Sequence, residues 1–299
     1  MGGISFIVNP VAGGRSGRLQ DQLLEDIRFR FPDAECLLTS ASGEAEQLAR
    51  ARRDLDSQRV IAVGGDGTVS EVGRGLVGGR ATLGVIPLGS GNDFARMLGM
   101  PTDTGAALLH LAQARAMPCD VGRVRIRHAD DTAIETHFIN SLGLGFEAEV
   151  ADRAARARWC KGFWRYLVAA LRLLPVYRAP RMRLAYDDQC IDAPQFLLAL
   201  GNGRWAGGGF MLTPKAELDD GWLELTRADA LPLWRLLTIF PRVFSGRHLG
   251  CRGVHADRVR SIRIECPAAC MVHGDGEILA RHALEIEVEL LPGALQVLR

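Results

Sequence analysis

The chain has 299 residues, 47% of them hydrophobic and 24% charged, and its formal net charge is +1. This composition is ordinary for a folded globular protein, and the length allows two domains. The balanced charge gives no sign of nucleic-acid binding, and no uninterrupted apolar stretch reaches the roughly 18 residues that a membrane-spanning helix needs.

The first part of the chain alternates between two kinds of segment. Runs at 4–10, 34–40, 59–63 and 81–89 predict strands, and segments at 16–31, 43–55, 68–77 and 92–100 predict helices. Strands that alternate with helices form a parallel sheet covered on both faces. We therefore predict a doubly wound α/β domain over residues 1–120.

The pattern changes from residue 121 onward. Alternating or β-branched runs predict antiparallel strands at 121–131, 132–145, 181–189, 193–202, 221–228, 258–267 and 283–298. Helical intervals at 147–177 and 231–246 interrupt them. We therefore predict a β-rich, β-sandwich-like domain over residues 121–299, with the active site in the cleft between the two domains. Whether the last strands return to the first domain is left open.

The seven cysteines and the amino-terminal segment bear on the compartment. Most of the cysteines are far apart, and "MGGISFIVNP" lacks the basic start and long apolar stretch of a secretory signal. We therefore expect reduced thiols and a cytoplasmic protein. Cys266, Cys270 and His273 lie close together, but a zinc site would need a fourth ligand and a partner pair.

Three glycine-rich loops follow predicted strands of the first domain: "NPVAGG" at 9–14, "GGDGT" at 64–68 and "PLGSGND" at 87–93. Ligands of an open parallel sheet collect at the carboxyl ends of its strands. Glycines let a ligand approach the backbone closely, and exposed amides and helix N-termini favour anionic oxygens. One such loop could be a plain tight turn, but three at one edge predict a phosphate site.

The residues around these loops narrow the chemistry. The motif GxxxxGK[ST] is absent, and the loose GxGxxA pattern at 143–148 has no carboxylate about 20 residues further on. A P-loop and a dinucleotide dehydrogenase are therefore disfavoured. Asp66 would repel a phosphate, but it suits a magnesium ion or a hydroxyl that loses its proton. This combination points to phosphoryl transfer.

Motifs along the whole chain resemble one family. "NPVAGG", "GGDGTVSEV", "PLGSGNDFAR", "PKAELDDGWLEL" and "HGDGEI" look like the diacylglycerol kinase catalytic-domain family, which includes bacterial soluble lipid kinases and is related to sphingosine and ceramide kinases. The resemblance implies a first domain like those of phosphofructokinases and NAD kinases. It also implies an ATP-dependent kinase that phosphorylates a lipid hydroxyl. A diacylglycerol-like lipid, phosphatidylglycerol and a sphingoid base all remain open as substrate.

The resemblance also implies roles for individual residues. Glu277 would accept the hydroxyl proton, and Asp66 is a second candidate for that role. A structural Mg²⁺ would be held by the side chain of Asp220 and by backbone carbonyls of Glu217 and Trp222. The residues that would contact ATP are Asn9, Pro10, Val11, Ala12, Gly13, Thr39, Gly64, Gly65, Asp66, Gly67, Thr68, Val69, Ser70 and Ser90. By spacing alone, "HGDGE" and "LDDG" are also typical of hairpin turns with solvated acids.

A soluble kinase for a lipid has to reach a membrane surface. The interval from Arg153 to Arg183 holds nine basic residues and no acid, interleaved with aromatic and aliphatic side chains, and residues 231–252 form a second candidate. This pattern is typical of peripheral association with an anionic membrane, and equally of an amphipathic helix with solvated arginines. Charge reversal at Arg156, Arg158 and Arg165 would distinguish the two.

Two other functions remain open. One is a kinase for a soluble hydroxyl compound such as NAD, and the other is a non-catalytic nucleotide-sensing protein. The intact acids Asp66, Asp220 and Glu277 argue against the second. The oligomeric state is also open, with a dimer among the options.

Overall fold

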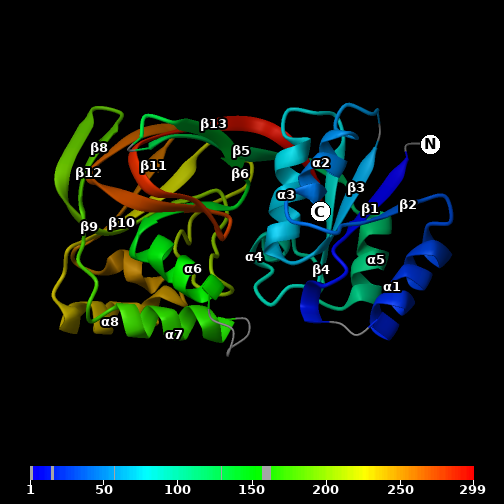
Figure 1. Cartoon of the computed structure of the whole chain (residues 1–299), viewed down its shortest axis with the longest axis horizontal. Helices are drawn as coiled ribbons and strands as arrows, with labels where there is room; N and C mark the ends of the chain where they lie inside the picture. The colour runs from blue at the N-terminus through cyan, green and yellow to red at the C-terminus, as the bar shows by residue number, and fades with distance from the viewer. Residues whose placement is uncertain (1–2, 15–16, 57, 129, 157–162) are drawn as a thin grey trace. The chain divides into compact units, whose positions relative to one another are not determined.

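The chain divides into two units, one comprising Met1–Asp120 with Pro292–Arg299 and the other Val121–Leu291 (Figure 1). The computed structural model describes residues 3–14, 17–56, 58–128, 130–156 and 163–299. The chain passes from the first unit to the second within strand β5 (Ala116–His128) and returns within strand β13 (Glu277–Leu298).

A parallel sheet forms the centre of the first unit. Its strands are β1 (Ile4–Val8), β2 (Glu35–Leu38), β3 (Arg59–Gly64) and β4 (Thr82–Pro87), joined by the end of β13 in the order β13-β4-β3-β1-β2. The apolar runs that predict β1, β3 and β4 are almost completely buried, as expected for strands covered on both faces. The last residues of the chain therefore complete the sheet that the first residues begin.

Helices cover both faces of this sheet. They are α1 (Gly17–Arg30), α2 (Glu44–Arg50), α3 (Asp66–Leu76), α4 (Asp93–Met97) and α5 (Thr104–Gln113), with a 3₁₀ turn at Ala12–Gly14. Figure 1 shows α1 beside α5 on one side of the sheet and α2 beside α3 on the other. Helix α3 buries Val69, Val72 and Leu76, whose spacing places them on one face of the helix.

The second unit consists mainly of antiparallel strands. They are β6 (Ala133–Phe138), β7 (Ser141–Gly145), β8 (Arg181–Tyr186), β9 (Gln189–Gly201), β10 (Leu223–Asp229), β11 (Val254–Val259) and β12 (Ser261–Gly274), together with parts of β5 and β13. Hydrogen bonding gives the order β11-β10-β9-β7-β12-β13, with β8 paired to β9 and β12 and β5 paired to β6 and β13. Apolar side chains from these strands form one buried cluster.

Three helices pack on this β-structure: α6 (Phe146–Arg156), α7 (Phe163–Leu173) and α8 (Leu233–Val243), followed by a 3₁₀ turn at Arg247–Gly250. Their buried side chains share a second apolar cluster with Phe196 of β9. The rings of Phe146 and Phe196 stack with centroids 4.6 Å apart. The predicted architecture, an α/β domain followed by a β-sandwich-like domain, is confirmed.

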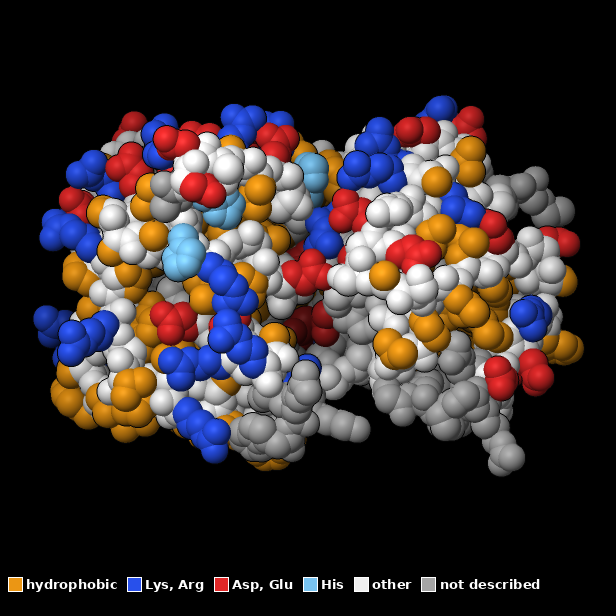
Figure 2. All heavy atoms as spheres, in the orientation of Figure 1, with side chains coloured by type: hydrophobic (Ala, Val, Ile, Leu, Met, Phe, Trp, Pro, Cys, Tyr) orange, Lys and Arg blue, Asp and Glu red, His pale blue; other side chains and the backbone are white. Residues whose placement is uncertain are grey.

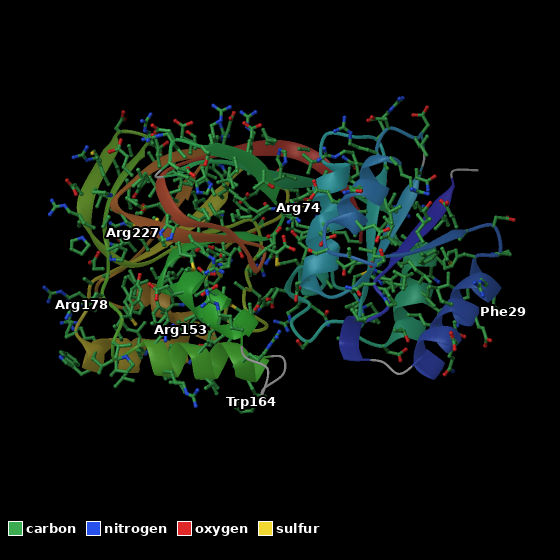
Figure 3. The ribbon with its side chains drawn as sticks, viewed as in Figure 1. Phe29, Arg74, Arg153, Trp164, Arg178 and Arg227 are labelled. Carbon is green, nitrogen blue, oxygen red and sulfur yellow. The ribbon has the colours of Figure 1, made fainter. Side chains whose placement is uncertain are left out.

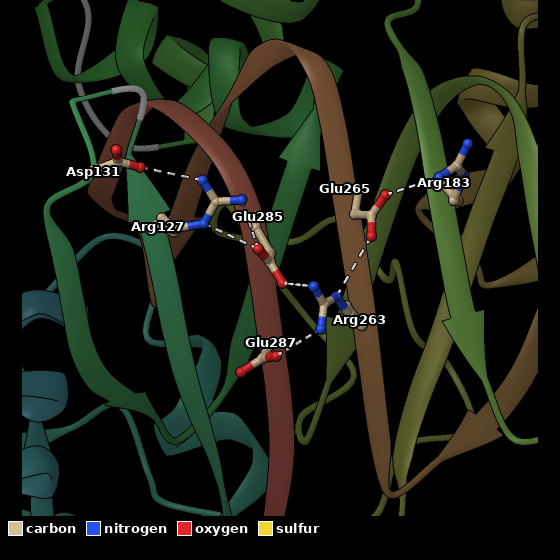
Figure 4. Close-up of polar contacts among 7 residues, drawn as sticks. All are labelled: Arg127, Asp131, Arg183, Arg263, Glu265, Glu285 and Glu287. Atoms are coloured by element: carbon tan, nitrogen blue, oxygen red, sulfur yellow. Dashed lines mark hydrogen bonds and ion pairs between the residues drawn. The ribbon is translucent and has the colours of Figure 1, made fainter.

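Charged side chains are paired across the neighbouring strands β5, β13, β12 and β8 (Figure 4). Arg127 of β5 donates to Glu285 of β13 at 2.8 Å, and Arg263 of β12 pairs with the same carboxylate. Arg263 also lies 3.4 Å from Glu287. Opposite charges on adjacent strands stabilise the pairing of those strands.

Among the described residues, no helix is both long and apolar enough to cross a membrane.

Candidate active site

The three glycine-rich loops, at 9–14, 64–68 and 87–93, lie at the carboxyl ends of the neighbouring strands β1, β3 and β4. Asn9 ties two of them together. Its amide donates to the carbonyl of Val63 at 3.0 Å, and its Nδ2 donates to Oγ1 of Thr68 at 3.1 Å. Its Oδ1 accepts the amide of Val11 at 3.1 Å, which shapes the loop that follows β1. Asn9 therefore orders the first loop against the start of α3.

The second and third loops touch through glycines. A Cβ placed on Gly89 would lie 2.7 Å from the Cα of Gly65, so the two backbones meet with no room for a side chain. Asn92, at the start of α4, has a left-handed backbone with φ of 54°. Its side chain accepts the amide of Gly89 at 2.9 Å and donates to the carbonyl of Gly89 at 2.8 Å. The third loop is thereby closed on itself.

Asp66 joins the second loop to the helix after the third. Its Oδ2 accepts the amide of Asn92 at 2.9 Å, and its Oδ1 accepts the amide of Asp93 at 2.8 Å. The carboxylate thus occupies the N-terminus of α4, where backbone amides favour negative charge. An aspartate inside a predicted anion loop has a structural explanation here. These two amides are therefore already hydrogen-bonded to a carboxylate.

The remaining predicted nucleotide contacts differ in accessibility. Thr39 is buried, and its amide and hydroxyl both donate to the carbonyl of Val8, at 2.9 and 3.4 Å. Ser70 is also buried, and its hydroxyl accepts Nη1 of Arg74 at 2.8 Å. Ser90 is exposed at the tip of the third loop. Of these three hydroxyls, that of Ser90 is the most open to a ligand.

The "HGDGE" segment is a tight hairpin between β12 and β13. Gly274 pairs with Glu277, and both residues of the turn, Asp275 and Gly276, have positive φ values of 50° and 85°. Such a two-residue turn matches the twist of the two strands. Glu277 is half-buried at the first position of β13.

Spacing alone predicts a hairpin with solvated acids here, but Asp275 is buried. Its Oδ1 accepts the amides of Asn140 and Ser141, and its Oδ2 accepts the amide of Ile139, each at 2.9 Å. Its own amide donates to the carbonyl of Ser141 at 2.8 Å. One buried carboxylate therefore holds the turn that precedes Glu277 against the start of β7.

The predicted magnesium ligands lie in the loop before β10. Oδ1 of Asp220 accepts the amide of Trp222 at 3.1 Å, and Oδ2 lies 3.3 Å from Nη1 of Arg258. Glu224, which the sequence did not indicate, is buried below this loop and accepts the amide of Lys215. Burial raises the pKa of the Glu224 carboxyl.

The oxygen ligands that this loop offers are of the type that a hard cation prefers, but they are too few to complete its coordination shell. A carboxylate and backbone carbonyls are oxygen ligands of the kind Mg²⁺ prefers. Arg258, however, competes for Asp220. Within the described part of the chain, no three His, Cys, Asp or Glu side chains are grouped closely enough to hold a metal. Residues 217, 220 and 222 would therefore need water or a ligand to complete a coordination shell.

Models of two protein families match the chain. The diacylglycerol kinase catalytic domain matches residues 3–124, and the YegS C-terminal NAD kinase beta sandwich-like domain matches residues 140–299. The chain is 33% identical to a diacylglycerol kinase of Mycobacterium tuberculosis over 100% of its own length and 96% of that protein. It is 32% identical to a probable lipid kinase YegS-like protein of Cronobacter sakazakii, over 88% of this chain and 85% of the relative.

Solved structures show the same similarity. A putative diacylglycerol kinase from Bacillus anthracis superimposes with a TM-score of 0.78 at 26% identity, covering 99% of this chain and 96% of that one. Yeast NADH kinase in complex with NADH shares the fold at a TM-score of 0.56 and 10% identity, covering 99% and 83% of the two chains. The matches extend over both units and all five quoted motifs. This chain therefore belongs to the diacylglycerol kinase family of lipid kinases.

Proposed function

We propose that this protein transfers the γ-phosphate of ATP to the hydroxyl of a diacylglycerol-like lipid, phosphatidylglycerol or a sphingoid base. The observation that carries the proposal is the meeting of three glycine-rich strand ends beside the N-terminus of α3 in the first unit. Family membership supplies the reaction class, and this cluster supplies a place for the phosphates.

The phosphates would bind at the start of α3 rather than at α4. Gly65 precedes the first turn of α3 in an extended conformation, and amides of a first helical turn point out of the helix. The α4 amides that face Asp66 are engaged by its carboxylate. Because no P-loop lysine is present in the sequence, backbone amides would carry more of the phosphate charge.

Glu277 is the proposed proton acceptor. A hydroxyl becomes a better nucleophile when a positioned carboxylate takes its proton, and such a base contributes about a hundred- to ten-thousand-fold in rate. Both carboxylate oxygens of Asp66 already accept backbone amides of the third loop and α4. Glu277 instead follows a turn that Asp275 fixes by three hydrogen bonds. The proposed role of Asp66 is to hold the two loops together.

Mg²⁺ is part of the same proposal. The side chain of Asp220 and the carbonyls of Glu217 and Trp222 would bind a structural ion. That ion would stabilise the conformation of the loop before β10. Arg258 would have to release one oxygen of Asp220 when the ion binds. Further magnesium would arrive with ATP, as phosphoryl transfer requires.

The test uses two variants of one strand. Glu277→Gln should lose at least about a hundredfold in the rate of lipid phosphorylation while still binding ATP. Glu287→Gln, ten residues further along β13 and on the outer ion-pair network, should keep wild-type turnover. Labelled ATP and a total lipid extract provide the assay, and isothermal titration measures ATP binding. Wild-type turnover by Glu277→Gln would remove this residue from the proposed role.

The same assay separates the two other functions. Phosphate transfer to NAD, with none to lipid, would identify a kinase for a soluble compound. ATP binding without transfer to any hydroxyl would identify a nucleotide-sensing protein.

A further inference from the structure

Helices α7 and α8 of the second unit expose large apolar side chains to solvent. Trp164 of α7 and Trp234 of α8 are 61% and 64% exposed. The exposed apolar residues of this region, which we call the tryptophan face, are Trp164, Leu171, Val176, Leu233, Trp234, Leu237 and Phe244. Figure 3 shows Trp164 directed away from the β-structure, on the outer side of α7. Single exposed apolar residues are normal, but five on these two helices, with Val176 and Phe244 just beyond their ends, form a patch.

Aromatic side chains join the start of α7 to the end of α8, which places the exposed residues of both helices on neighbouring parts of the surface. The rings of Phe163 and Phe244 have centroids 5.7 Å apart, and Phe210 lies between them at 5.5 and 5.0 Å. Both helices turn their buried side chains toward the cluster that contains Phe196 of β9. Their exposed apolar side chains therefore lie on the side away from the β-structure. Figure 2 shows hydrophobic side chains gathered over α8, with arginines beside them.

Helix α8 is apolar on both sides. It buries Leu236 and partly buries Ile239 and Phe240, while Leu233, Trp234 and Leu237 face outward. A soluble surface helix normally keeps charged residues on its outer side. The outward residues of α8 therefore indicate a second apolar environment in addition to the protein core.

Charge identifies that environment. Helices α7 and α8 together hold four arginines and no acid. Arg172 and Arg242 are exposed on α7 and α8, and Arg235 lies over the ring of Trp234 at 5.3 Å. A second copy of this chain on the same face would bring the arginines of these two helices against those of its partner, because a two-fold contact pairs a surface with itself. An anionic membrane satisfies both the apolar and the basic groups.

We propose that the tryptophan face is the surface by which this protein docks on an anionic phospholipid bilayer. Trp164 and Trp234 enter the region between headgroups and acyl chains, where indole rings are favoured, and the arginines contact anionic headgroups. The proposal rests on the proposed function, because a lipid kinase must meet its substrate in a bilayer. The tryptophan face lies within the two intervals, 153–183 and 231–252, that the sequence suggested. Arg156 pairs with Asp152 of its own helix at 2.9 Å, and Arg158 lies outside the described residues.

Flotation of the full chain with vesicles tests this docking without ATP. The vesicles contain phosphatidylcholine and phosphatidylglycerol in equal parts, or phosphatidylcholine alone. Wild-type protein should float with the anionic vesicles, and Trp164→Ala and Trp234→Ala should each weaken partition about tenfold, as expected for withdrawing a large apolar side chain from an apolar phase. Phe29→Ala is the matched control, because Phe29 is 88% exposed on α1 of the first unit (Figure 3).

A second pair of variants tests the charge. Arg172→Glu with Arg235→Glu should lower partition onto anionic vesicles and leave the weaker binding to phosphatidylcholine unchanged. The proposal would be overturned if the double variant Trp164→Ala/Trp234→Ala floated as well as the wild type, or if the wild type did not float. Light scattering measures the oligomeric state of the same variants. If the wild type is a dimer, and the tryptophan substitutions dissociate it without changing flotation, the face binds a second copy of the chain and the docking proposal fails.

Activity in detergent micelles keeps the two proposals distinct. If the wild type floats but phosphorylates no lipid in micelles or vesicles, the docking surface stands and the proposed function fails. If it phosphorylates lipid in micelles and the tryptophan variants float unchanged, the function stands and the docking surface fails. If both hold, the double tryptophan variant should lose activity on vesicles and keep it in micelles.

Discussion

Replacing Asp275 with alanine removes the acceptor of three backbone amides at once. A hydrogen bond to a charged group contributes about 1.5 kcal/mol at the lower end of its usual range, so three give about 4.5 kcal/mol. A typical domain has only about 5–15 kcal/mol of total stability. We therefore expect Asp275→Ala to destabilise the second unit severely. Asp275→Asn keeps one oxygen for the amides of Asn140 and Ser141 but turns a donor toward Ile139, and it should cost about 2 kcal/mol.

Part of the alanine effect comes from the backbone, and a second turn measures it. Asp187, in the hairpin between β8 and β9, also has a left-handed backbone with φ of 47°, but its side chain is exposed. Asp187→Ala should cost about 1 kcal/mol, the strain of alanine in that conformation. Urea unfolding gives the free energies, and hydrogen exchange followed by mass spectrometry reports on the amides of residues 139–141. Equal costs for the two alanine variants, with unchanged exchange at 139–141, would refute the reasoning.

Two further predictions concern stability. Glu285 is 13% exposed and lies between two arginines, whereas Glu287 on the same strand is 46% exposed. Glu285→Gln should lower the free energy of unfolding by about 1 kcal/mol and Glu287→Gln by less than about 0.5 kcal/mol, with the difference shrinking at high salt; a larger effect at Glu287 would contradict this. Burial lowers the pKa of His248 below its ordinary value of 6.5, so the folded protein binds this proton less readily than the unfolded chain. The contribution of neutral His248 is complete above pH 6.5 and is lost as the pH falls toward the folded pKa. His248→Gln should flatten that part of the stability curve measured by urea unfolding, and an unchanged slope would count against the assignment.

Much of the first unit could be predicted because most of its strands are short apolar runs followed by residues typical of turns. Residues 59–63 are such a run, and β3 begins at Arg59 and ends at Gly64. Helix α5 was not predicted, because "TGAALLHLAQ" has few polar residues to show a periodic pattern. A usable signal precedes it: the side chain of Asp103 accepts the amide of Ala106 and caps the helix.

The contacts inside the candidate site could not be predicted in the same way. Motifs named Asp66, but its hydrogen-bond partners lie 26 and 27 residues further on and depend on how two loops meet. Asp275 is separated from its three partners by at least 134 residues. Local patterns report the tendency of a segment to form a turn or a strand. They carry no information about which backbone amide, far away in the sequence, will donate a hydrogen bond to a given carboxylate.

The contact between Gly65 and Gly89 affects how sequence variation in such proteins should be interpreted. A Cβ on Gly89 would lie 2.7 Å from the Cα of Gly65 and 2.8 Å from Oδ1 of Asn92, so any larger residue would push the loops apart. This intolerance arises from the backbone geometry and would persist in a protein that had lost its activity. A glycine kept at these positions during evolution is therefore a marker of shared ancestry in the sheet, and it says little about which molecule is phosphorylated.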